Sequence, residues 1–199
     1  HGAIGIHYLG FMKLARGARK RVAIKGFFEP LSDRKVKLYR NAIRRLHAVG
    51  APIIKIGFVK MKLPDTTPST ATEKWVQVSE LWGSARGSKF LPNDYMKYYE
   101  KEDTLELKKK MVLAYTKIAR AGLRPQPDVL GVLKNKKDVR IIDLDMLVER
   151  LSKLTEHRLT DIAWSLKKCI AHCASPSELE VLNAYAYNHA GDMLRPFLK

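Results

Sequence analysis

The uneven placement of charge is the feature that most constrains how this chain can fold. The first 62 residues hold 15 Lys and Arg but only two acidic residues, Glu29 and Asp33, so the segment has a formal charge of +13. The rest of the chain holds 22 basic and 18 acidic residues. Such an excess repels itself, and a partner that supplies phosphates relieves the repulsion while releasing counterions. The pattern favours nucleic acid as the partner, and a basic face that is only solvated is the alternative.

Composition narrows the class of protein further. Of the 199 residues, 46% are hydrophobic, which is too apolar for a disordered polycation even at a net charge of +17. No uncharged stretch approaches the roughly 20 apolar residues that span a bilayer, so we expect no transmembrane segment. Two cysteines are too few for a disulfide framework, which favours a reducing or organelle-matrix compartment. Because the chain begins with His1, we expect any targeting segment to lie outside this sequence.

The sequence predicts a mainly α fold that opens with a basic extended arm. Five glycines within residues 1–31 argue against a long helix there. Residues 32–63 are predicted to form a helix-strand basic element, a small α+β element whose helix starts at Ser32 or Asp33. A bulge is predicted at Gly57 in its strand. The apolar face of the helix is formed by Val36, Tyr39, Ile43 and Leu46.

Residues 64–72 are predicted to be a linker. They contain two prolines and five Ser/Thr, which show no helical or strand periodicity and provide few apolar side chains for a core.

Residues 73–138 are predicted to be a helical middle region with loops. Helical spacing first returns at Trp75, Val78, Leu81 and Trp82. A stronger helix is predicted from about Thr104 to Ala121, started by a capping box of Asp103 and Glu106. Its buried stripe consists of Leu107, Met111, Ala114, Ile118 and Ala121.

Residues 139–199 are predicted to be a region of stacked helical hairpins. Leucines at helical spacing indicate a first helix, followed by a second helix around Leu166. The run Ser175-Pro176-Ser177-Glu178 predicts the start of a third helix. It places a capping Ser first, a Pro at the first helical position, and a Glu whose side chain can bond back to the capping residue. A fourth helix is predicted to begin at Met193. The helix spacing of about 17 to 19 residues is typical of solenoids.

A resemblance to organellar RNA-associated proteins is carried by the run Leu159-Thr160-Asp161-Ile162-Ala163-Trp164-Ser165-Leu166 and the Ser-Pro helix start that follows. Residues 141–198 resemble heptatricopeptide and octotricopeptide repeats, which occur with FAST-kinase-like and RAP-domain proteins. The resemblance implies helical hairpins associated with RNA. No terminal RAP-like region is present, so the resemblance gives no support for nuclease activity. In general character, a basic extended N-terminus joined to small helical units is similar to mitochondrial ribosomal proteins.

The sequence offers no catalytic arrangement, and we expect neither an enzyme nor a cofactor. Cys169, His172 and Cys173 lie within five residues, which raises the question of a zinc site. Structural zinc usually takes paired ligands from two loops, so we interpret the cysteines as buried small hydrophobes and predict no metal. Asp143 and Asp145 are explained by the favourable interaction of acids with a helix N-terminus.

These patterns predict a non-catalytic structural RNA-binding component of a ribonucleoprotein, most specifically a ribosomal protein of the mitochondrial matrix. Its partners would be rRNA or other structured RNA and the neighbouring proteins of a large assembly, without a small-molecule substrate. Phosphate contacts give salt-sensitive binding with little sequence preference. The predicted RNA-binding residues are Arg16, Arg19, Lys20, Arg21, Lys25, Arg34, Lys37, Arg40, Arg44, Arg45, Lys60 and Lys62.

Two other functions stay open at this point. An organellar helical-repeat factor for RNA processing or stability would bind single-stranded RNA through residues 141–199. A protein-only assembly subunit of a mitochondrial complex would instead direct its basic face to acidic protein or anionic lipid.

Overall fold

The computed structural model describes residues 5–13, 17, 19–62, 73–80, 104–133, 138–148 and 155–198. The chain divides into two compact units. Unit 1 comprises His1–Arg40 and Ile54–Arg86, and unit 2 comprises Asn41–Ile53 and Gly87–Lys199. Each unit has its own core and is described by itself.

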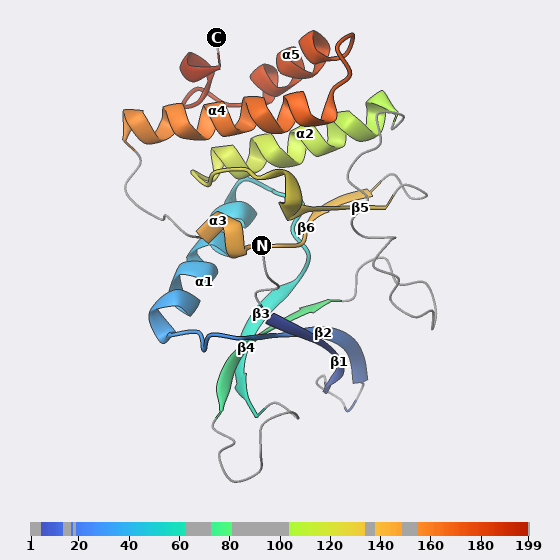
Figure 1. Ribbon diagram of the computed structural model, residues 1–199, viewed down its shortest axis with the longest axis vertical. Helices are drawn as coiled ribbons and strands as arrows, with labels where there is room; N and C mark the ends of the chain where they lie inside the picture. The colour runs from blue at the N-terminus through green and yellow to red at the C-terminus, as the bar shows by residue number, and fades with distance from the viewer. Residues whose placement is uncertain are drawn as a thin grey trace. The chain divides into compact units, whose positions relative to one another are not determined.

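Unit 1 is built on an antiparallel sheet of four strands in the order β1-β2-β4-β3 (Figure 1). The strands are β1 (Gly5–Lys13), β2 (Arg19–Phe27), β3 (Ile56–Met61) and β4 (Lys74–Glu80). β1 and β2 form a hairpin, whereas β4 lies between β2 and β3. Val76 of β4 is fully buried, as expected for a central strand. The pairing is regular at Gly57, which lies opposite Val78, so the predicted bulge is not formed.

Helix α1 (Asp33–Ala48) begins in unit 1, where its first turns pack through Tyr39 against one face of this sheet. Ser32 Oγ accepts a hydrogen bond from Lys35 N at 3.2 Å, so Ser32, one of the two predicted candidates, caps the helix. Tyr39 is 1% exposed, and its ring centroid lies 5.0 Å from that of Phe58 on β3 and 6.4 Å from that of Phe27 on β2. The side of the sheet that carries Phe27 and Phe58 is called the helix side below.

In unit 2, helices α2 (Leu105–Arg120), α4 (Glu156–Cys173) and α5 (Leu179–His189) pack on one another (Figure 1). α2 matches the helix predicted over 104–121, and its whole predicted stripe is buried. Thr104 Oγ1 caps the helix by accepting from Leu107 N at 3.4 Å. Apolar residues at helical spacing on α4 and α5 complete the core: Ile162, Leu166, Ile170, Leu182 and Ala186.

A two-stranded antiparallel sheet, β5 (Leu130–Leu133) and β6 (Asp138–Ile141), also packs in unit 2. The short turn η4 (Pro127–Val129) precedes it, and the short helix α3 (Asp145–Val148) follows it. Tyr115 of α2 is fully buried and donates its hydroxyl to the carbonyl oxygen of Pro127 at 2.9 Å. This contact anchors the start of the small sheet to α2.

The prediction of a mainly α fold is wrong. The described residues contain six strands in two antiparallel sheets beside the helices, which makes an α+β fold. The predicted extended arm is the hairpin β1–β2 in its described residues, because its β-branched and aromatic side chains find partners on neighbouring strands. The helix predicted around Trp75 is β4, whose apolar residues also fit the two-residue alternation of a strand.

In the C-terminal region, α4 and α5 match the second and third predicted helices. Of the predicted capping box only the bond from Glu178 is formed, since Ser175 N donates to Glu178 Oε2 at 2.9 Å. Ser175 does not cap the helix, because α5 begins three residues later than predicted, with Glu178 at its N-cap and no side-chain cap bond. The fourth predicted helix is instead a single turn of 3-10 helix, η6 (Arg195–Phe197). The predicted linker 64–72 lies outside the described residues. Among the described helices, none has the length and apolar character needed to cross a membrane.

Candidate nucleic-acid interface

The hairpin β1–β2 presents an aromatic ring among cationic side chains. Antiparallel register places Phe11 opposite Arg21 and Lys13 opposite Arg19. The guanidinium carbon of Arg21 lies 5.8 Å from the ring centroid of Phe11, yet Phe11 is 65% exposed. Leu9, also on this side of β1, is 66% exposed. Exposed aromatic rings interleaved with cations are typical of surfaces that bind single-stranded nucleic acid.

Side-chain alternation along β2 divides the predicted cations between the two faces of the sheet. Arg19, Arg21 and Lys25 share the helix side with Phe27, and Lys25 Nζ lies 5.5 Å from the Phe27 ring centroid. Lys20 is on the opposite face, where its Nζ lies 3.9 Å from Glu80 Oε2. The sequence prediction treated these four cations as one group, whereas the sheet brings together only three of them.

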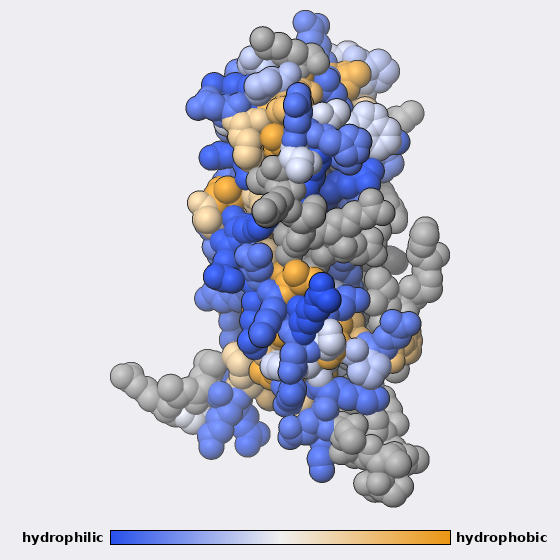
Figure 2. Space-filling view, turned by 90° about the vertical axis from the view of Figure 1, so that its left-hand side faces the viewer, coloured by the Kyte–Doolittle hydropathy of each residue, from blue (hydrophilic) through white to orange (hydrophobic). Residues whose placement is uncertain are grey.

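Helix α1 adds a second set of cations within unit 1. Arg34 and Lys37 are exposed on its first turns, as is Lys35, which the sequence analysis did not select. These three cations are therefore open to solvent. Figure 2 shows one face of the protein, on which hydrophilic side chains cover most of the described residues with smaller hydrophobic areas between them.

Arg40 and Lys60, two other predicted RNA-binding residues, make internal contacts around Trp75. The Arg40 guanidinium carbon and Lys60 Nζ lie 5.4 Å and 5.2 Å from the Trp75 ring centroid. Arg40 Nη2 also donates to the Phe58 carbonyl oxygen at 3.4 Å. Trp75 Nε1 donates to Asp33 Oδ1 at 2.6 Å, which joins the start of α1 to β4.

The hydrogen bond from Trp75 lowers the pKa of Asp33 below its ordinary value, and the positive charge of Lys60 lowers it further. Lys60 Nζ lies 3.7 Å from Asp33 Oδ1. The carboxylate therefore stays ionised and offsets part of the positive charge of this cluster. We assign Arg40 and Lys60 chiefly to holding α1 on the sheet.

The remaining predicted cations are distributed elsewhere. Lys62 follows β3 directly and is exposed, whereas Arg16 lies outside the described residues. Arg44 and Arg45 belong to unit 2, where Arg45 is half-buried. The pKa of Arg158, also in unit 2, is lowered first by burial and then by the charge of Arg45. Arg158 Nη2 donates to the Gly122 carbonyl oxygen at 3.4 Å.

Sequence reasoning missed Phe11 and Leu9 because it interpreted residues 1–31 as an arm. The alternation of Leu9, Phe11 and Lys13 opposite a basic strand could have indicated the hairpin. Sequence reasoning also missed the V-A-I-K motif formed by Val22-Ala23-Ile24-Lys25. Protein kinases have this motif on a strand that precedes a helix. Here the segment lies on β2, the strand that precedes α1.

The two cysteines lie inside unit 2, and both are buried and free. Burial raises the pKa of both Cys169 and Cys173 to about 12. Cys173 Sγ donates to the Cys169 carbonyl oxygen at 3.2 Å, whereas His172 is exposed. Within the described ranges, no three His, Cys, Asp or Glu side chains are grouped so that they could hold a metal ion.

Comparison with known proteins finds no family model that matches the chain and no curated protein that matches it. Among solved structures, the PAN3 pseudokinase of Drosophila melanogaster is similar, with a TM-score of 0.42 and 13% sequence identity. The match covers 96% of this chain and 53% of that chain, so this chain spans about half the length of the structure it matches.

Proposed function

We propose that this protein is a non-catalytic RNA-binding component of a ribonucleoprotein and that unit 1 contacts the RNA. The observation that carries the proposal is the helix side of the β1–β2 hairpin, where an exposed Phe11 lies among Lys13, Arg19 and Arg21. A base can stack on the ring while the cations contact the phosphates on either side.

Charge supports the same assignment. Unit 1 holds fifteen Lys and Arg against five Asp and Glu. An excess of this size within one folded unit steers polyanions toward it and gives binding that weakens with salt. In its most specific form the proposal remains a mitochondrial ribosomal protein that contacts rRNA, which sedimentation of the native protein with ribosomal subunits would test.

Fluorescence anisotropy with labelled single-stranded RNA tests the proposal on the intact chain. Phe11→Ala is expected to weaken binding by about five- to a hundredfold, because a base–aromatic stack contributes about 1–3 kcal/mol. Arg19→Gln with Arg21→Gln is expected to weaken binding and to lower the salt dependence, because two phosphate contacts are lost.

The matched controls are Phe28→Ala and Lys168→Gln. Phe28 is 60% exposed but follows the hairpin, and Lys168 is exposed on α4 of unit 2. Both controls are expected to bind RNA like the wild type within about twofold, because exposed residues away from the binding surface contribute little. Equal losses in control and hairpin variants would show that RNA binds through overall charge alone, against the proposal.

A second candidate function, nucleotide binding without phosphoryl transfer, is favoured by the V-A-I-K segment on β2. In kinases this lysine pairs with the α- and β-phosphates of ATP and with a glutamate of the following helix. Lys25 stands at the lysine position and is half-buried, but α1 contains no Glu. The sequence also lacks the H-R-D-x-x-x-x-N run that carries the catalytic base.

Calorimetric titration with Mg-ATP tests this second candidate. It predicts saturable binding that Lys25→Met abolishes and that Lys37→Gln, on the exposed face of α1, leaves unchanged. No phosphate release is expected. Equal affinity of the wild type and the Lys25→Met variant would exclude the candidate, whatever the outcome of the RNA experiments.

A further inference from the structure

The face of the unit 1 sheet opposite α1 contains a hollow of about 400 Å³. Its floor is aliphatic, and Val22 at its base is 3% exposed. Val59 and Met12, which line it from β3 and β1, are 46% and 42% exposed. Cavities of about 300–1,000 Å³ with mostly apolar linings are typical of small-molecule sites.

Two glycines shape this hollow. A Cβ atom added to Gly10 would lie only 2.6 Å from Ile24 Cδ1, so the bare backbone of Gly10 gives the Ile24 side chain room. A Cβ atom added to Gly57 would meet nothing within 4 Å. The missing side chain at Gly57 therefore leaves open space over its neighbour Val78.

The charged groups that line the hollow gather at one end. The register brings Lys20 of β2, Glu80 of β4 and the start of β3 together there. The two cations are Lys20 and Lys55, and Glu80 is the one acid among the described lining residues. Glu80 is already engaged, because its Oε1 accepts from Lys55 N at 2.9 Å and its Oε2 lies 3.9 Å from Lys20 Nζ. This end is therefore net positive.

We propose that the hollow binds a free fatty acid, with its carboxylate at Lys20 and Lys55 and its alkyl chain over Ile24, Gly57 and Val78. One anionic head and one aliphatic tail match a site with cations at one end and an aliphatic floor. A peptide would place backbone amides over the same floor, where each unpaired polar group is costly. The site goes beyond RNA binding, because Ile24, Gly57 and Val78 lie on the face of the sheet opposite Arg19 and Arg21. Phe11 also borders the hollow.

Calorimetric titration of the intact chain with dodecanoate, below its micelle-forming concentration, tests the proposal. Saturable binding of one equivalent is expected. Gly57→Val is expected to weaken it by at least about tenfold, because the new side chain takes the space of methylene groups, each contributing about fourfold when buried. Lys20→Gln is expected to weaken it by about two- to fivefold, as for an exposed ion pair. Lys37→Gln is the control and is expected to bind like the wild type.

Two further ligands separate the roles of head and tail. Dodecyltrimethylammonium has the same tail with a cationic head and is expected to bind more weakly than dodecanoate, whereas butanoate is expected to show no saturable binding. If Gly57→Val lowers the thermal stability, Val59→Gln takes its place, because Val59 is partly exposed and the amide makes the hollow polar.

Equal dodecanoate binding by the wild type and both hollow variants would overturn the proposal. A second result would also overturn it: the protein binds an acidic amphipathic peptide but not dodecanoate, and Gly57→Val abolishes the peptide binding. The hollow would then be a site for a protein partner. RNA affinity is expected to be the same in Gly57→Val and wild type. Failure of the fatty-acid proposal can therefore be distinguished from failure of the RNA proposal.

Discussion

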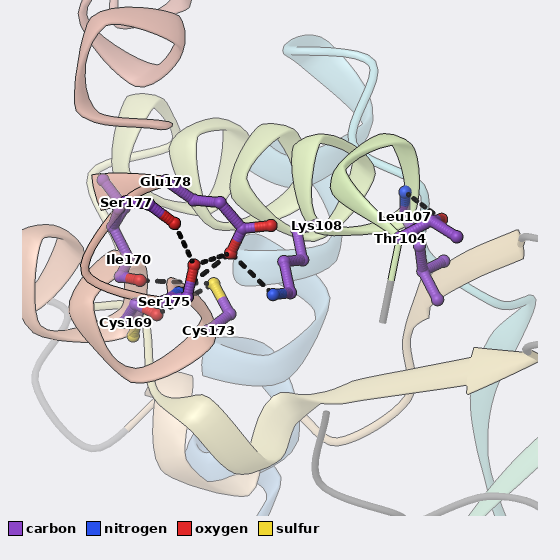
Figure 3. Close-up of polar contacts among 9 residues, drawn as sticks. All are labelled: Thr104, Leu107, Lys108, Cys169, Ile170, Cys173, Ser175, Ser177 and Glu178. Atoms are coloured by element: carbon purple, nitrogen blue, oxygen red, sulfur yellow. Dashed lines mark hydrogen bonds and ion pairs between the residues drawn. The ribbon is translucent and has the colours of Figure 1, made fainter. Parts of the chain in front are cut away.

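Lys108 Nζ of α2 lies 2.7 Å from Glu178 Oε2, at the start of α5, and Lys108 is 1% exposed (Figure 3). The carboxylate also accepts from the hydroxyl of Ser175 at 2.7 Å. Glu178 therefore compensates a buried ammonium and fixes the turn that connects α4 to α5. This ion pair joins two helices of the unit 2 core.

Glu178→Gln is expected to destabilise the protein, because it removes the carboxylate that lies 2.7 Å from the buried Lys108 ammonium. Lys108→Met combined with Glu178→Gln is expected to recover much of the loss, since an apolar side chain suits the buried position. Thermal unfolding of the single and double variants measures this. A double variant less stable than Glu178→Gln would contradict the argument.

Acid is expected to weaken the same contact. Hydrogen bonds from Lys108 and then Ser175 lower the pKa of Glu178 from about 4.5 to about 2. A lowered pKa stabilises the fold above the unfolded value, so the contribution is complete above pH 4.5 and is lost as pH falls toward 2. Urea unfolding between pH 6 and pH 3 is expected to show a smaller loss of stability for Glu178→Gln than for the wild type. Parallel profiles would show that Glu178 is not responsible.

Trp75→Phe is expected to raise the pKa of Asp33 toward its ordinary value, because the indole hydrogen bond is the largest cause of the lowering. Carbon-13 NMR titration of the Asp33 carboxyl group measures this shift. Trp164→Phe, which alters an exposed indole on α4, is the control and is expected to leave Asp33 unchanged. If the pKa of Asp33 is unchanged in Trp75→Phe, the positive charge of Lys60, and not the indole hydrogen bond, is the main cause of the lowered pKa.

Gly50→Ala is expected to destabilise the protein by about 1 kcal/mol, because Gly50 ends α1 with a left-handed φ of +64°. This corresponds to a fall of about 2–4 °C in Tm for a chain of this size. Gly57→Ala is the matched control, since the strand position has open space around the added Cβ and a strand φ. Equal effects at the two positions would contradict the backbone argument.

The two cysteines are expected to be inert in the native protein. Burial raises the pKa of each thiol to about 12, so the reactive thiolate is scarce at neutral pH. An aromatic disulfide reagent is therefore expected to label neither thiol in the native state and both in denaturant. Rapid labelling of the native protein would show that the α4 core opens readily.

The helices could be predicted from the sequence where the spacing of apolar residues and the capping residues indicated the same helix bounds. Val36 and Tyr39 on α1, and Met111 and Ile118 on α2, repeat at helical spacing between clear start and stop residues. The strands were less predictable, because their stability depends on partners far along the chain. Trp75 pairs with Lys60 across the long β3–β4 connection, and local spacing around Trp75 suited a helix as well as a strand.

The candidate site was predictable in composition but not in geometry. Charge counting identified Arg19 and Arg21, yet their common face with Phe11 follows only from the hairpin register. Lys20 lies between Arg19 and Arg21 in the sequence, but its side chain is on the opposite face of the sheet. Arg40 was selected for its charge, but its contact with Trp75 depends on how α1 lies on the sheet.

Ultraviolet cross-linking of uridine-rich single-stranded RNA to the intact chain, followed by mass spectrometry of the cross-linked peptides, tests the central claim most directly. The account predicts cross-links to peptides of the β1–β2 hairpin, including the one that contains Phe11, and their loss in Phe11→Ala. Cross-links confined to unit 2, or hairpin cross-links that Phe11→Ala leaves unchanged, would contradict it.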